Sequence, residues 1–187
     1  MTTNDHDRVD GIDDRSAARA DGGAGGSSDA GTARDRQPVV VRPFGYVPEE
    51  AVIRRVGDCD AYIGNEHAAD PAYHDRSFDF VLSATEEPKP STTHHHSLVD
   101  GPGNGWRAFA AAVDDTRTLL ERDGSTLVHC RAGVSRSATL LATAIAAEAG
   151  RSFRDALDDV QAARPPAMPH PALFENAIVY LAARDEL

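Results

Sequence analysis

Lysine is nearly absent from this chain of 187 residues. Of its 19 basic residues only Lys89 is a lysine, so 19 − 1 = 18 are arginines, and 30 acidic residues bring the formal net charge to −11. Nucleic acids and anionic membranes attract basic surfaces, so this composition argues against both as partners. It also indicates a halophilic protein, because at 1 M salt charges are screened within about 3 Å. An ordinary acidic protein from a GC-rich genome is the alternative.

Cysteines and long apolar runs are also scarce. The two cysteines, Cys59 and Cys130, cannot build a disulfide framework. We expect Cys59 to be a small core residue, and a reversible bridge between it and Cys130 stays open. The sequence contains no run of 18 apolar residues, and its first residues do not resemble a signal peptide, which predicts a cytoplasmic protein.

Large apolar side chains are almost missing from residues 1–37, which are rich in Asp, Gly, Ala, Arg and Ser. Burial of apolar surface therefore cannot offset the entropy lost on ordering this segment. The composition predicts a disordered, acidic Gly/Ala-rich tail, for which an interaction role stays open. Residues 38–187 have the length and composition of one folded domain.

Short apolar runs alternate with helical patterns in residues 38–187, which predicts an α/β fold with a mainly parallel central sheet flanked by helices. Ligands of such sheets bind outside the carboxyl ends of the strands. The last helix is expected to turn Leu173, Phe174, Ile178 and Leu181 toward the core. We expect strands at 39–41, 53–56, 60–65, 77–83, 96–99 and 125–128. Helices are expected at 66–73, where Pro71 breaks the helix, and at 106–122, 138–149, 153–163 and 172–183.

The most informative stretch reads Val128-His-Cys-Arg-Ala-Gly-Val-Ser-Arg-Ser137, between a strand pattern and a helix pattern. Five residues separate Cys130 from Arg136, so the loop can curl around an anion with its N–H groups inward, at a helix N-terminus that favours negative charge. Arg136 offers a planar fork that matches two phosphate oxygens. The same field favours a thiolate at Cys130. The pattern predicts a phosphoryl group held over a sulfur nucleophile; a buried structural cysteine is the alternative.

The segment HCRAGVSRSA resembles the His-Cys-x-x-Gly-x-x-Arg-Ser loop of the cysteine-dependent protein tyrosine phosphatase superfamily, and is most similar to the dual-specificity phosphatase branch. The resemblance covers about residues 38–183 and includes an Arg-Pro pair after the helix at 153–163. It implies the three-layer fold of that branch for a catalytic domain at 38–187. It also implies phosphomonoester hydrolysis through a phosphocysteine intermediate, without a cofactor.

The resemblance also implies roles for single residues. Cys130 corresponds to the nucleophile, and Asp100, 130 − 100 = 30 residues earlier in a strand-to-loop position, corresponds to the general acid; a turn-capping role for Asp100 is the alternative. His129 is expected to hydrogen-bond to the loop backbone, and Ser137 to donate to the sulfur. The side chain of Arg131 is expected to point outward. The phosphate would be bound by the Arg136 side chain and by the backbone of Arg131, Ala132, Gly133, Val134, Ser135 and Arg136.

The loop does not by itself select a substrate. We favour phosphotyrosine in proteins, with some activity on phosphoserine and phosphothreonine, and expect a monomer. A phosphoinositide, a nucleotide, an RNA 5′-phosphate or a non-catalytic phosphate-binding module are the alternatives. Consecutive residues of a strand point to opposite faces, so His94, His95 and His96 predict no shared metal site.

Overall fold

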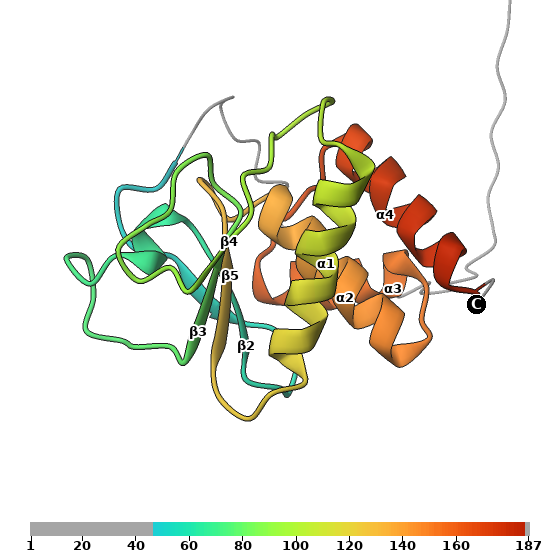
Figure 1. Ribbon diagram of the computed structural model, residues 1–187. Coiled ribbons are helices and arrows are strands. Elements are labelled where there is room, and N and C mark those ends of the chain that lie inside the picture. The colour runs from blue at the N-terminus through green and yellow to red at the C-terminus, as the bar shows by residue number, and fades with distance from the viewer. Residues whose placement is uncertain (1–46, 186–187) are drawn as a thin grey trace, which may run out of the picture. The chain divides into compact units, whose positions relative to one another are not determined.

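The computed structural model describes residues 47–185 (Figure 1). The predicted tail at 1–37 and the predicted strand at 39–41 lie outside these residues. The elements in chain order are β1 (Ile53–Arg55), β2 (Ala61–Gly64), the 3₁₀ helix η1 (Glu66–Ala69), β3 (Phe80–Ser83), β4 (His94–His95), α1 (Trp106–Leu120), β5 (Thr126–His129), α2 (Arg136–Ala149), α3 (Phe153–Ala163) and α4 (Pro171–Asp185).

Over the described residues the strands form one sheet in the order β1-β2-β5-β3-β4. Only β1 is antiparallel to its neighbour, so the predicted mainly parallel sheet is confirmed. The central strand β5 pairs with β2 and β3, and its last residue, His129, is level with Gly64 on one side and Ser83 on the other. The carboxyl ends of three parallel strands thus meet at one edge, and Cys130 follows directly.

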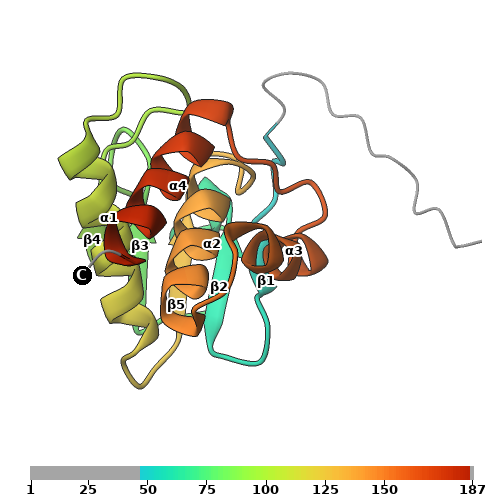
Figure 2. The same cartoon turned by 90° about the vertical axis from the view of Figure 1, so that its right-hand side faces the viewer.

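The four α-helices cover one face of the sheet, while η1 and long loops lie over the other (Figures 1 and 2). Helix α2 is the centre of the helical layer, since it contacts α1, α3, α4 and β5. Its Ala-, Leu- and Thr-rich sequence suits this place, because small side chains let neighbouring helices pack closely. The predicted α/β fold is confirmed, and its second helical layer is reduced to one short element.

Two helix ends follow their local sequence signals. Helix α2 ends at Gly150, whose φ of +58° is the left-handed conformation that glycine adopts easily. Helix α3 starts after Ser152, whose hydroxyl accepts a hydrogen bond from the Asp155 N–H at 3.1 Å. The helix predicted at 66–73 stops before Pro71, where a break was expected: it is the 3₁₀ helix η1, and Asp70 is extended, as residues before proline prefer.

The buried side of α4 differs from the prediction. Leu173 is buried as expected, but the other buried residues are Ala177 and Tyr180, and Phe174 and Ile178 remain 44% and 42% exposed. The Tyr180 hydroxyl accepts a hydrogen bond from Arg117 of α1 at 3.1 Å, which fixes the rotation of α4 about its axis. A polar anchor on a neighbouring helix therefore decided which face is buried.

Cys59 is exposed, so the prediction of a core residue was wrong. It lies in the turn between β1 and β2, where its sulfur contacts the Val56 carbonyl oxygen at 3.5 Å. This turn precedes the amino end of β2, whereas Cys130 follows the carboxyl end of the parallel strand β5. The two thiols lie at opposite edges of the sheet, beyond the Cα separation that a disulfide spans, and both are free.

Candidate active site

The stretch from Cys130 to Arg136, called the cysteine loop below, connects β5 to α2 and packs against the end of β2. The Cys130 N–H points to the Gly64 carbonyl oxygen at 3.4 Å. Gly133 has a φ of +66°, and a Cβ atom at this position would lie 2.6 Å from the Gly64 oxygen. Glycine is therefore required here both by the backbone conformation and by the close approach of two chains.

Five consecutive carbonyl groups of the cysteine loop point outward to donors elsewhere. This holds for each residue from Arg131 to Ser135. Their oxygens accept from the Glu66 N–H at 3.2 Å, from Arg164 Nη2 at 3.1 Å and Nε at 3.2 Å, from the Met168 N–H at 2.8 Å and from the Thr139 N–H at 2.8 Å, in chain order. A chain that sends its carbonyls outward turns its N–H groups inward, which forms a concave anion site.

Cys130 is buried, and its sulfur lies 3.2 Å from the Ser137 hydroxyl. Burial alone raises the pKa of this thiol. The charge of Arg136, the Ser137 hydroxyl and the backbone N–H groups of Ser137 and Val134 act in the opposite direction and hold the pKa of Cys130 below its ordinary value. The site therefore favours the nucleophilic thiolate.

Arg136 is oriented by backbone groups from two other segments. Its Nη1 donates to the carbonyl oxygens of Ala84 at 2.9 Å and Leu98 at 3.0 Å. Its Nε is buried and has no hydrogen-bond partner among residues 47–185. A buried donor without a partner is unfavourable, and an anion seated in the loop would satisfy it. The guanidinium is thus fixed on one side and offers its other edge to a ligand.

His129 has a hydrogen-bond partner that the sequence did not indicate. Its Nε2 bonds to the hydroxyl of Ser83, which in turn lies 2.5 Å from the Thr92 hydroxyl. The Cys130 backbone lies close to the ring, but burial is the larger effect and lowers the pKa of His129 to about 4. His129 is therefore neutral near pH 7, which agrees with a positioning role.

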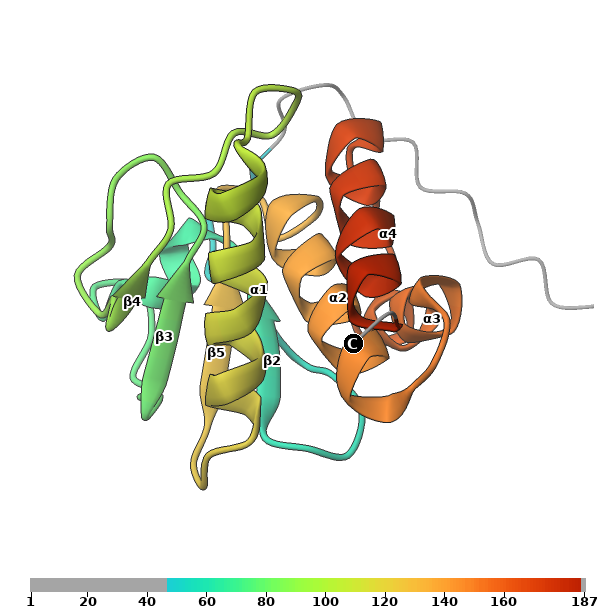
Figure 3. The ribbon, with the colours of Figure 1, turned by 45° about the vertical axis from the view of Figure 1, so that its right-hand side comes forward.

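Asp100 lies in the connection between β4 and α1, and it is exposed. The strand predicted at 96–99 was wrong: β4 is His94–His95, because its partner β3 ends at Ser83. Leu98, two residues before Asp100, is buried and gives its carbonyl to Arg136. Figure 3 shows this connection at the same end of the sheet as the start of α2. The general-acid role of Asp100 stays a prediction.

The neighbouring histidines and Arg131 point in separate directions. His94 contacts the Thr93 hydroxyl at 2.9 Å, His95 the Thr85 carbonyl at 2.9 Å and His96 the Asp115 carboxylate at 2.8 Å. Within residues 47–185 no group of three or more His, Cys, Asp or Glu side chains could hold a metal ion. Arg131 is exposed, as predicted.

Arg164 was not among the predicted site residues, although it belongs to the Arg-Pro pair after α3. It is buried, and its guanidinium contacts two carbonyls of the cysteine loop. Ser83 was also missed, since a serine at the end of a strand carries no signal for a contact with His129. An arginine directly before Pro165 at a helix end was the only sequence signal for either residue.

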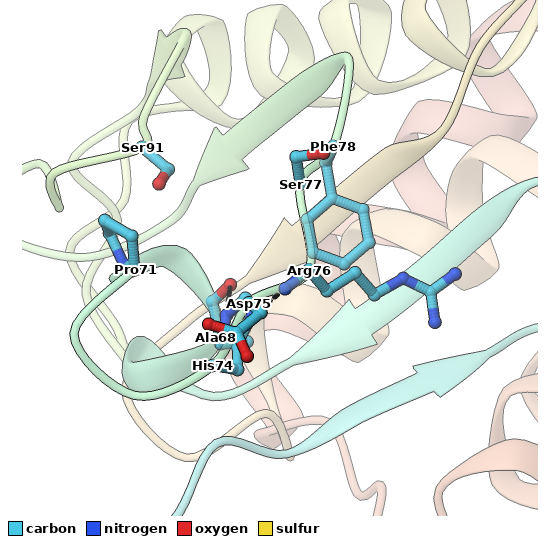
Figure 4. A pocket seen from close by; sticks show the side chains of 8 residues that line it. All are labelled: Ala68, Pro71, His74, Asp75, Arg76, Ser77, Phe78 and Ser91. Atoms are coloured by element: carbon cyan, nitrogen blue, oxygen red, sulfur yellow. Dashed lines mark hydrogen bonds between the residues drawn. The ribbon is translucent and has the colours of Figure 1, made fainter.

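A pocket of about 280 Å³ lies away from the cysteine loop, beside η1 and β3 (Figure 4). It is lined by Ala68, Pro71, His74, Asp75, Arg76, Ser77, Phe78 and Ser91. The Arg76 guanidinium extends past Phe78 in Figure 4, and it lies 5.3 Å from the centre of the Phe78 ring and 4.1 Å from the centre of the Tyr62 ring. This cation is engaged in packing, so the pocket differs from the anion site.

Comparison with known proteins identifies the family. A model of the family described as "Dual specificity phosphatase, catalytic domain" matches residues 61–180, which contain the cysteine loop, Asp100 and Arg164. The chain belongs to the dual-specificity phosphatase family. Its match starts at β2 and ends within α4, so it spans the sheet edge and the helices that surround the cysteine loop.

Similar dual-specificity phosphatases come from distant organisms. The chain is 31% identical over 122 residues to dual specificity protein phosphatase 15 of Mus musculus, covering 62% of this chain and 52% of that protein. It is 31% identical over 94 residues to MAP kinase phosphatase with leucine-rich repeats protein 3 of Dictyostelium discoideum, covering 49% of this chain and 11% of that protein. The chain thus spans at most about half the length of these curated relatives.

The fold is shared with solved structures of the family. The crystal structure of human DUSP28 superposes with a TM-score of 0.63 at 22% identity, covering 75% of this chain and 99% of that chain. This likeness supports the mixed, mostly parallel sheet with four helices. Over the described residues, no helix has the length and apolar character needed to cross a membrane.

Proposed function

We propose that this protein is a phosphatase that hydrolyses phosphotyrosine in proteins, with some activity on phosphoserine and phosphothreonine. Residues 38–187 would form its catalytic domain. The observation that carries the proposal is the cysteine loop: a thiol with a lowered pKa lies inside a ring of outward carbonyls, next to an arginine with an unpartnered buried N–H. This arrangement suits an oxyanion above a sulfur nucleophile.

In the first step the Cys130 thiolate attacks phosphorus, so that an S–P bond forms while the bond from phosphorus to the leaving oxygen breaks. Asp100 donates its proton to that oxygen. Arg136 and the backbone N–H groups of residues 131–136 bind the equatorial oxygens, on which transition-state charge is spread. The products are the free hydroxyl compound and a phosphocysteine.

In the second step Asp100, now ionised, takes a proton from a water molecule that attacks phosphorus. The S–P bond breaks, inorganic phosphate forms, and the electron pair returns to sulfur. Ser137, whose hydroxyl lies 3.2 Å from the sulfur, stabilises the departing thiolate by donating a hydrogen bond. His129, neutral and buried beside Ser83, positions Cys130 without exchanging protons.

A protein substrate is favoured because the cysteine loop has little cationic surface. Arg131 is its only exposed basic side chain, beside Ala132, Val134 and Ser135. A phosphoinositide carries several phosphates, which bind best to clustered Lys and Arg side chains. The chain's formal charge of −11 likewise disfavours polyanionic substrates such as RNA.

The proposal is tested by a turnover assay of the full chain on p-nitrophenyl phosphate, phosphotyrosine and phosphothreonine peptides, and a phosphoinositide. We expect the phosphotyrosine peptide to be the best natural substrate. Cys130→Ser should abolish turnover but keep phosphate binding, because the loop donors and Arg136 supply most of the anion affinity. Cys59→Ser is the matched control and should stay active. Phosphate binding without turnover by the wild type would instead make the protein a binding module.

A further inference from the structure

The outer side of the cysteine loop is braced by the segment that links α3 to α4. Arg164 donates from Nε to the Gly133 oxygen at 3.2 Å and from Nη2 to the Ala132 oxygen at 3.1 Å. The Met168 N–H donates to the Val134 oxygen at 2.8 Å, and the His170 N–H to the Ser135 hydroxyl at 2.9 Å. Four consecutive loop residues therefore contact one short stretch of chain.

Within this brace, only Arg164 acts on the backbone of the loop through its side chain. Its own position is well fixed, since its N–H donates to the Val160 oxygen and its carbonyl accepts from the Ala167 N–H, each at 2.8 Å. It is only 6% exposed, so its charge lies within the protein behind the loop. A planar guanidinium can serve two neighbouring carbonyls at once, which an ammonium group does less well.

The two carbonyls that Arg164 holds belong to Gly133 and to Ala132 directly before it. Gly133 has a φ of +66° there, and glycine has the freedom to leave this conformation. Without Arg164 both oxygens would lose these donors, one in a buried and one in a partly buried contact, and rotation of a peptide group could carry an oxygen toward the anion site. A carbonyl oxygen facing inward repels a phosphate oxygen where an N–H would bind it.

We propose that Arg164 is a positioning residue that holds the cysteine loop in its phosphate-binding conformation from behind, without touching the substrate. This proposal rests on the proposed phosphatase function but concerns a step that precedes chemistry, the binding of an oxyanion. The two arginines then have separate roles. Arg136 binds phosphate from inside the loop, and Arg164 orients the loop backbone that binds it.

The test compares Arg164→Lys and Arg164→Gln with the wild type in the full chain. The dissociation constant of inorganic phosphate is measured by calorimetry, and kcat and KM are measured with p-nitrophenyl phosphate. Both measurements are made at a temperature well below the unfolding midpoint of every variant. Lysine keeps the charge but loses the fork, so phosphate affinity and kcat/KM should fall about tenfold. Glutamine loses the charge as well, so phosphate affinity and kcat/KM should fall about 100-fold, the size of loss expected when binding groups are displaced.

Arg151→Gln is the matched control. Arg151 lies before α3, at the opposite end of the helix from Arg164, and its guanidinium bonds to Asp159 at 2.6 Å and to the Asp155 oxygen at 3.1 Å. It should change neither phosphate affinity nor kcat/KM. Ethylguanidinium added to Arg164→Ala should restore part of the activity, and ethylammonium, which has no fork, should restore less.

A purely structural role would appear differently. The Arg164 variants would then unfold at lower temperature but bind phosphate and turn over within twofold of the wild type, which would overturn the proposal. A wild type that binds no phosphate would overturn it too. If the wild type binds phosphate but turns over no substrate, the phosphatase function fails, and phosphate affinities of the Arg164 variants still decide the positioning role.

Discussion

The two loops that the proposed chemistry needs are held in opposite ways. In the cysteine loop every carbonyl from Arg131 to Ser135 is bonded to another part of the chain. In the acid loop, residues 99–105, only Gly101 is buried. The Gly105 oxygen accepts from the Phe109 N–H of α1 at 3.1 Å, and the hydrogen bonds inside the loop come from one side chain. Asn104 accepts from the Val99 N–H at 2.8 Å and donates to the oxygens of Val99 at 2.8 Å and Gly101 at 3.1 Å.

This difference follows from what each loop does. The phosphate group is the same in every substrate, so its donors are best fixed in advance, when no reorganisation is needed at the moment of reaction. The leaving oxygen belongs to a group that varies, so the acid benefits from a loop that can adjust. Arg136 couples the two, because its Nη1 donates to the Leu98 carbonyl just before the acid loop.

The largest effect should come from Asp100→Asn, which removes the proton donor of the acid loop. Turnover of a tyrosyl or alkyl phosphate should fall by about 10²–10⁴-fold, and that of an activated ester far less, because its leaving group needs no proton. The alkaline limb of the pH profile, which reports loss of the general acid's proton, should flatten. Steady-state kinetics on both substrates over pH 5–9 measures this.

Asp123→Asn, on the exposed turn after α1, is the control and should leave the profile intact. Full activity and an unchanged alkaline limb in Asp100→Asn would assign the acid role to another carboxylate. Glu86 and Glu87, which are exposed after β3, would be tested next. Asp79 is excluded, since it accepts the Ser125 N–H at 2.7 Å at the amino edge of the sheet.

The rigidity of the cysteine loop is tested by Gly133→Ala beside Gly57→Ala. Both glycines have a φ near +65°, but a Cβ atom at Gly57 meets nothing within 4 Å, whereas at Gly133 it meets the Gly64 oxygen at 2.6 Å. Gly57→Ala should destabilise the fold by about 1–2 kcal/mol and keep kcat/KM. Gly133→Ala should lower kcat/KM by about 100-fold. Equal kinetics for the two variants would show that the loop tolerates displacement.

Asn104→Ala should loosen the acid loop alone. We expect kcat on a tyrosyl phosphate to fall about fivefold, as the loss of hydrogen bonds worth about 1 kcal/mol predicts, while phosphate affinity stays unchanged. Because Asn104 would act through Asp100, the double variant with Asp100→Asn should be no slower than Asp100→Asn alone. Additive losses would mean that Asn104 acts on the substrate itself.

Ser137→Ala should shift the pH dependence of the nucleophile. The Ser137 hydroxyl lowers the pKa of Cys130, so its loss raises that pKa, and the acidic limb of kcat/KM moves to higher pH. The pH dependence of Cys130 alkylation by iodoacetamide should also shift to higher pH. The alkylation assay is done in the Cys59→Ser variant, because exposed Cys59 would otherwise react as well. Thr143→Ala, a buried hydroxyl farther along α2, should leave both profiles in place. An acidic limb that stays in place in Ser137→Ala would contradict a role of the Ser137 hydroxyl in lowering the pKa of Cys130.

The smallest effect should be that of salt, which acts on the acidic surface and spares both loops. With a formal charge of −11, self-repulsion in dilute buffer should ease as potassium chloride reaches molar concentration, and the midpoint of thermal unfolding should rise. Circular dichroism across a salt series measures it. A flat or falling midpoint would remove the halophilic interpretation of the composition.

The sequence by itself determined the parts of this protein that depend on neighbouring residues. The spacing of Cys130 and Arg136, Gly133 between them and the helix that follows are local features, and local backbone preferences shape a loop of seven residues. The alternation of strands and helices determined the α/β class in the same way. The start of α3 at the Ser152 cap and the end of α2 at Gly150 were predictable for the same reason, because helix ends depend on neighbouring residues.

Tertiary structure decided whatever depends on contacts between distant segments. Arg164 reaches loop carbonyls about 30 residues away, and Ser83 meets His129 across 46 residues, pairings that no local pattern encodes. The same holds for the rotation of α4, which the Tyr180 hydroxyl fixes on α1, and for the exposure of Cys59 in a hairpin turn. A sequence pattern records which side chains prefer burial, whereas the packing of elements decides which of them find partners.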